Sequence, residues 1–134
     1  MKLIVDSSIL FAGLIKDSTT RWLLFHIDAE LLTVDFSYHE VKKHQELICQ
    51  KSKLTEVELF FILNKMREKL TILPNKEVNT RFEEAYQIMK DIDPQDSMFL
   101  AAALAANPHI WSDDLHFQKQ NKVRVWTTKE LVKL

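Results

Sequence analysis

Five short apolar segments recur along the chain, separated by stretches long enough to form helices. Each segment is rich in Ile, Val, Leu or Trp, and they comprise residues 2–6, 31–34, 70–73, 109–112 and 123–126. Short apolar runs without polar alternation are typical of parallel strands that are buried on both faces. We therefore predict a mostly parallel sheet of about five strands.

The stretches between these segments carry apolar residues at helical spacing. One series runs through Leu59, Phe60, Leu63, Met66 and Leu70, and a second through Val78, Phe82, Ala85, Tyr86 and Met89. We expect both series to form amphipathic helices that cover a sheet. The Ala-rich run 99–106 predicts a closely packed helix that ends at Asn107-Pro108, because proline cannot continue it.

Strands that alternate with helices predict an α/β fold, a three-layer α/β/α arrangement around the sheet. The 134 residues, of which 46% are hydrophobic, are enough for one domain spanning 1–134. The chain shows neither a signal-peptide pattern nor an apolar run that could cross a bilayer, and its single cysteine, Cys49, fits a reducing compartment. We expect a cytoplasmic protein with no membrane association.

Ligands in open α/β sheets bind beyond the carboxyl ends of the strands, so the residues there are the candidates for chemistry. Asp6 ends the first predicted strand and Asp113-Asp114 follows the fourth, while Glu40 and Asp96 open predicted helices. Carboxylates are hard oxygen ligands, and several of them together repel one another unless cations neutralise them. The pattern indicates a site for Mg²⁺ or Mn²⁺.

Each acid also has a purely structural interpretation. Ser37-x-x-Glu40 has the form of a capping box, as does Thr55-x-x-Glu58, and Asp93 before Pro94 is a natural N-cap. Asp96 in a first turn would favour the helix dipole. Taken singly, none of these residues establishes a site.

Other site chemistries fit less well. The chain has one glycine, whereas phosphate-binding glycine loops need several. A phosphatase of haloacid-dehalogenase type needs a second Asp where Ser8 stands, and the five histidines lack zinc-site spacing. Trp22, Trp111 and Trp126 could stack on bases, although the strand positions of Trp111 and Trp126 favour the core.

Four segments, in order, resemble the successive motifs of the PIN-domain family. They are Leu3-Ile4-Val5-Asp6-Ser7-Ser8, Ser37-Tyr38-His39-Glu40-Val41, Asp93-Pro94-Gln95-Asp96-Ser97 before an Ala-rich helix, and Trp111-Ser112-Asp113-Asp114-Leu115-His116-Phe117. The chain departs from the family at Asp35-Phe36, where Pro or Ser is more frequent. The resemblance covers nearly the full length of the chain. Within the family, the chain resembles the small PIN-domain ribonucleases, among them the VapC-like toxins.

Carried over by position, the resemblance implies a catalytic, metal-binding cluster of Asp6, Glu40, Asp96 and Asp114. Four further residues would support it: Ser8 and Ser112 through their hydroxyl groups, and Asp93 and Asp113 in less defined roles. Side chains alternate along a strand, which favours Asp114 over Asp113 as the inner residue. A turn directly after Ser112 would remove that guidance and leave both open.

The resemblance further implies a metal-dependent endoribonuclease that cleaves single-stranded RNA. Small members of the family are often toxins held inactive by an antitoxin, and many form homodimers. Lys42 and Arg67 are among the basic candidates for contacting RNA. The alternative hypothesis is a non-catalytic PIN-like module that binds RNA or protein, and metal binding by the purified protein would distinguish the two.

Overall fold

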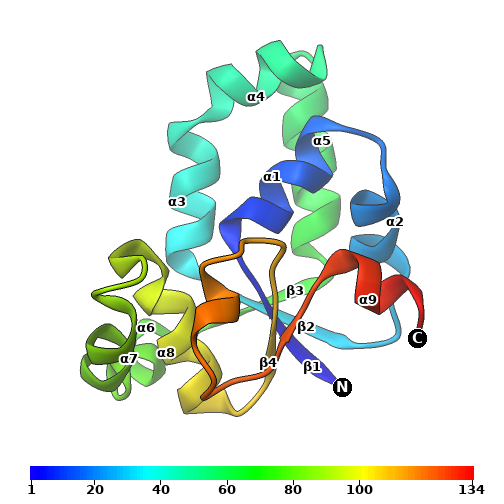
Figure 1. The fold of residues 1–134 in the computed structure, drawn as a ribbon. Coiled ribbons are helices and arrows are strands. Elements are labelled where there is room, and N and C mark those ends of the chain that lie inside the picture. The colour runs from blue at the N-terminus through cyan, green and yellow to red at the C-terminus, as the bar shows by residue number, and fades with distance from the viewer.

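A computed structural model of residues 1–134 shows one sheet of five parallel strands in the order β3-β2-β1-β4-β5 (Figure 1). The strands are β1 Lys2–Val5, β2 Glu30–Val34, β3 Leu70–Leu73, β4 His109–Trp111 and β5 Val125–Trp126. All four neighbouring pairs are parallel. The predicted α/β class is confirmed, because each predicted strand appears within two residues of its expected position.

Helices pack on both faces of this sheet. The first face carries α1 Ser7–Ile15, α2 Thr19–His26, α3 Asp35–Lys43, α4 Gln45–Ser52, α5 Glu56–Arg67 and α9 Thr128–Val132. The second face carries α6 Asn75–Asn79, α7 Phe82–Met89, α8 Ser97–Ala106 and the short 3-10 turns η1 Pro94–Asp96 and η2 Phe117–Lys119. In Figure 1, α3, α4 and α5 form an arch above the sheet, and α6, α7 and α8 gather at lower left.

An apolar core lies on each face of the sheet, between the sheet and its helices. Successive side chains of β1 point alternately into the two cores. Leu3 and Val5 belong to the core on the first face, whereas Ile4 belongs to the core on the second. The Ala-rich α8 buries Ala101 and Ala102 completely, because small side chains let a helix lie close to the sheet. It ends at Asn107, whose left-handed backbone (φ 64°) closes the helix before Pro108.

Two sequence-based expectations about packing are wrong. The series from Val78 to Met89 is two helices, α6 and α7, with a break at Thr80 and Arg81. Phe60 is 66% exposed, so the outer side of α5 faces solvent. Trp111 is fully buried as predicted, and Trp126 is partly buried and packs against the core of the first face, with the Arg124 guanidinium 3.8 Å from its ring centre.

The strand order places β1 between β2 and β4, with the helix after β1 on one face and α8, before β4, on the other. The order of the strands therefore switches direction between β1 and β4, and in open α/β sheets the ligand-binding crevice lies at such a switch point, beyond the carboxyl ends of the strands. Asp6 follows β1 directly, and the Asp113-Asp114 pair follows β4 after one residue, Ser112. None of the helices has the length and apolar character needed to span a bilayer.

Candidate metal centre

Asp6 is the innermost acidic residue of the crevice, with only 3% of its surface exposed. It is the N-cap of α1, and its Oδ1 accepts hydrogen bonds from the Ile9 main-chain N–H (3.0 Å) and the Ser8 hydroxyl (2.8 Å). Its Oδ2 accepts a hydrogen bond from the buried Ser112 hydroxyl. Both carboxylate oxygens are thus fixed by the chain.

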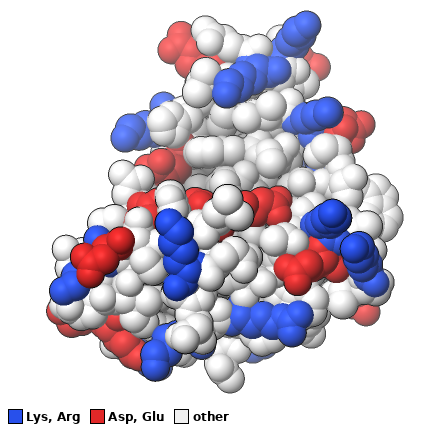
Figure 2. All heavy atoms as spheres, in the orientation of Figure 1, with Lys and Arg blue, Asp and Glu red and all other residues white.

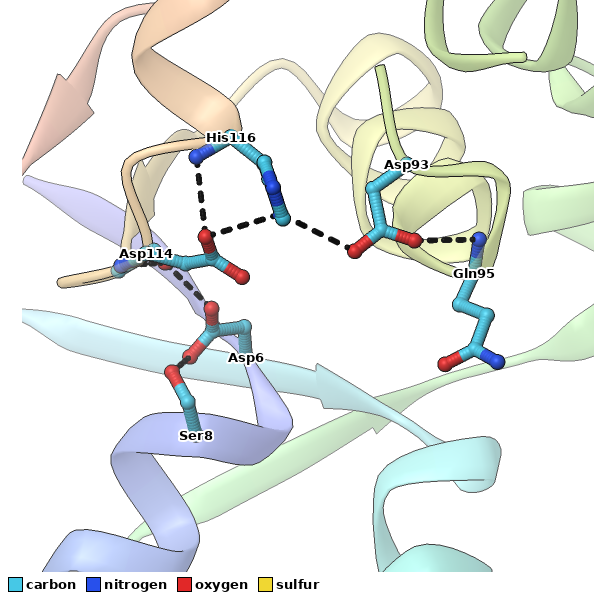
Figure 3. Close-up of polar contacts among 7 residues, drawn as sticks. Asp6, Ser8, Asp93, Gln95, Asp114 and His116 are labelled. Atoms are coloured by element: carbon cyan, nitrogen blue, oxygen red, sulfur yellow. Dashed lines mark hydrogen bonds and ion pairs between the residues drawn. The ribbon is translucent and has the colours of Figure 1, made fainter. Parts of the chain in front are cut away.

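The adjacent residues Asp113 and Asp114 lie in different surroundings. The main-chain N–H of Asp114 donates a hydrogen bond to the Ser112 hydroxyl at 3.0 Å. The Asp114 carboxylate points toward Asp6 and His116 (Figure 3). The two carboxylate oxygens of Asp113 instead accept hydrogen bonds from the main-chain N–H and hydroxyl of Thr128, both at 2.7 Å. Asp113 therefore anchors the start of α9.

Asp93 and Asp96 reach the crevice from the turn that precedes α8. Asp93 caps η1, with its Oδ1 accepting the Gln95 main-chain N–H at 3.2 Å, and Pro94 occupies the first position of that turn. Asp96 occupies the N-cap position of α8 without making a capping hydrogen bond. Its Oδ2 is buried and has no hydrogen-bond partner.

His116 lies between two of these acids (Figure 3). Its Nδ1 is 3.2 Å from Asp93 Oδ2 and 3.2 Å from Asp114 Oδ1. One donor atom from each of Asp93, Asp96, Asp114 and His116 lies within 4.8 Å of the others. We call these four residues the Asp–His group.

Burial and mutual repulsion disfavour the ionised carboxylates. The pKa of Asp96 is raised to about 7, chiefly by burial and then by the carboxylates of Asp93, Asp114 and Asp6. Burial also raises the pKa of Asp6, an effect that its hydrogen bonds from Ser112, Ser8 and Ile9 oppose. Acidic side chains form a band across the middle of the face in Figure 2. The amino ends of α1 and α8 favour negative charge there but do not cancel the repulsion.

Glu40 lies outside the Asp–His group. It is half-buried on α3, and its Oε2 is 3.6 Å from His44 Nε2 one turn further along. The expected capping box at Ser37 is wrong, because α3 already begins at Asp35 and the Ser37 hydroxyl donates to the Val34 carbonyl oxygen at 2.7 Å. The box at Thr55 and Glu58 is present. Glu40 therefore has no capping role, and its role as a ligand stays a prediction.

The sequence did not predict two members of the Asp–His group as metal ligands. Asp93 was expected only in a supporting role, and His116 was not assigned to the site. The only sequence signal for His116 is its position two residues after Asp114. The main-chain N–H of His116 donates to Asp114 Oδ1 at 2.9 Å, and this turn brings the chain back over the Asp114 carboxylate. Asp-x-His is too short a pattern to reveal such a turn by itself.

The group has the dimensions and donors of a divalent cation site. Two oxygens on opposite sides of Mg²⁺ are about 4.2 Å apart, close to the 4.8 Å within which the four donor atoms lie. The buried Asp96 Oδ2 has no hydrogen-bond partner and is therefore a donor atom that a bound cation would satisfy. Asp93, Asp96, Asp114 and His116 could hold the ion, with Asp6 beside them.

The family model for the PIN domain matches residues 4–133, nearly the whole chain. Among curated proteins, no significant match is found.

Proposed function

Since the chain belongs to the PIN-domain family, we propose that it is a divalent-metal-dependent endoribonuclease that cleaves phosphodiester bonds in single-stranded RNA. PIN domains are generally nucleases, and the strand order gathers acidic residues at the sheet edge where ligands bind. The observation that carries the proposal is the Asp–His group beside the buried Asp6. A divalent cation would neutralise the repulsion among these carboxylates, and Mg²⁺ and Mn²⁺ both suit carboxylate oxygens.

The chain's own residues would act by position. Ser8, Ser112 and Ile9 hold the Asp6 carboxylate in one orientation at the end of β1. The pKa of Asp96 is raised to about 7, so this carboxyl group is only partly ionised near neutral pH, and a bound cation would favour its ionised form. A bound Mg²⁺ or Mn²⁺ would lower the pKa of a coordinated water and stabilise charge on the attacking and leaving oxygens of the phosphodiester.

A cavity of about 380 Å³ between α3 and α5 supports a nucleic-acid substrate. Its lining combines aliphatic side chains and one acid, Glu56, with the cations Lys42 and Arg67 and the aromatic rings of Tyr38 and Phe60. The Arg67 guanidinium lies 4.8 Å from the ring centre of Tyr38. Single-stranded nucleic acids bind such surfaces through their phosphates and by stacking of bases on aromatic rings.

The proposal is tested with the purified full chain and an end-labelled single-stranded RNA, in EDTA, Mg²⁺ or Mn²⁺. We expect cleavage only with metal, and loss of cleavage in Asp6→Asn, whose circular dichroism should match the wild type. An Asp6→Asn protein that cuts as fast as wild type contradicts the site assignment. RNA binding without cleavage in either metal would instead identify the non-catalytic module.

The antitoxin partner, the homodimer and the cytoplasmic location implied by the sequence stay predictions.

A further inference from the structure

Two contacts fix the position of His116, one through its own main chain and one through the next residue. Its own main-chain N–H is bound to Asp114, and Phe117, the next residue, is fully buried in the core of the second face. The Nδ1 atom is buried, although 44% of the side chain is exposed. This nitrogen therefore points inward, toward the carboxylates.

The surroundings of this nitrogen are not those of a hydrogen-bonded histidine. Two carboxylate oxygens, from Asp93 and Asp114, approach Nδ1 at 3.2 Å, and neither contact has hydrogen-bond geometry. A ring N–H points in one direction within the ring plane, so it cannot serve two oxygens equally. A cation placed among the three atoms can contact all of them.

We propose that His116 is a nitrogen ligand of the bound metal ion and gives the centre a preference for Mn²⁺ over Mg²⁺. This inference rests on the proposed function, because it names the ligand set of the same site. The neutral imidazole would bind through Nδ1, beside oxygens of Asp93, Asp96 and Asp114.

The preference follows from the coordination chemistry of the two ions. Mg²⁺ takes oxygen ligands in a near-ideal octahedron and keeps several waters, so a nitrogen donor contributes little to its binding. Imidazole is a common ligand of transition-metal ions, and Mn²⁺, unlike Mg²⁺, belongs to that series while also suiting carboxylate oxygens. A site with three carboxylates and one imidazole is therefore better matched to Mn²⁺.

The test is pulsed electron paramagnetic resonance of Mn²⁺ bound to the full-length protein, which detects coupling to a directly bound ¹⁴N nucleus. We expect this coupling in the wild type and its loss in His116→Gln. His44→Gln is the matched control, because His44 is the other histidine close to a predicted site acid, at 3.6 Å from Glu40. The control should retain the nitrogen coupling.

Calorimetric titrations give the second measurement. His116→Gln should weaken Mn²⁺ binding by at least about tenfold, since even outer-shell substitutions lower metal affinity by 10–100-fold, and should change Mg²⁺ binding much less. Mn²⁺ binding without nitrogen coupling in the wild type overturns the role of His116 while leaving the metal nuclease intact. Coupling that disappears in His44→Gln also overturns it. Failure of the wild type to bind either ion contradicts the proposed function itself.

Discussion

The hydroxyl of Ser112 donates a hydrogen bond to Oδ2 of Asp6, joining two residues that are 106 positions apart in the sequence. The same hydroxyl accepts the main-chain N–H of Asp114. One fully buried side chain thus links the end of β1 to the loop after β4, and sets the position of two candidate ligands relative to each other.

We expect Ser112→Ala to weaken Mn²⁺ binding more than Ser8→Ala does. Ser112→Ala removes the donor to Asp6 Oδ2 in a fully buried position, and should also cost about 1–3 kcal/mol of stability. Ser8 is exposed, and Asp6 Oδ1 keeps the Ile9 N–H when Ser8 is replaced. Calorimetric titration and thermal unfolding of both variants provide the comparison, and equal losses would contradict the linking role of Ser112.

Asp113→Asn and Asp114→Asn should have separate effects. Asp114→Asn removes a charged donor from the Asp–His group, and we expect Mn²⁺ affinity to fall by at least about tenfold. Asp113→Asn should leave metal binding near normal and lower stability by up to about 1 kcal/mol, because Asp113 serves Thr128 at the start of α9. The reverse order of affinities would show that Asp113 is the inner ligand.

Glu40→Gln should weaken Mn²⁺ binding, but less than Asp114→Asn does, because Glu40 lies outside the Asp–His group. Glu58→Gln is the control, since Gln also completes a capping box and Glu58 belongs only to the box with Thr55. Titration of both proteins decides the role of Glu40. Identical affinity in the two variants would remove Glu40 from the site.

The metal-free protein should lose stability as the pH rises from about 4 to about 7. The pKa of Asp96 is 3.8 when unperturbed and about 7 in the folded chain. Between these pH values the folded state binds more protons than the unfolded state, so the free energy of unfolding decreases as the pH rises. Asp96→Asn should remove most of this pH dependence and stabilise the protein at pH 8 in EDTA by about 1–3 kcal/mol.

Thermal unfolding in EDTA across that pH range provides the measurement, with Asp91→Asn as the control because Asp91 is exposed and close in sequence. An Asp96→Asn protein that is no more stable than wild type at pH 8 would show that Asp96 is not under electrostatic strain. Adding Mn²⁺ should reverse the order of stabilities, since the wild type gains the free energy of metal binding.

The sequence by itself determined the elements and the layers. Buried parallel strands are apolar throughout and covering helices are apolar at helical spacing, so β1, β3 and α8 can be recognised without knowledge of their neighbours. It also determined which acids follow the strands, because Asp6 comes directly after the first apolar run and the Asp113-Asp114 pair comes after the fourth. These properties depend only on residues that are close together in the sequence.

Only the tertiary structure decided which donors meet. Asp93 and His116 approach to 3.2 Å because the turn before α8 and the loop after β4 converge, and no spacing in the sequence records that distance. The start of α3 at Asp35 likewise depends on how Ser37 bonds to Thr33 and Val34, which removed the capping role expected for Glu40. Contacts between remote residues depend on how elements pack, and packing is a property of the whole chain rather than of any one segment.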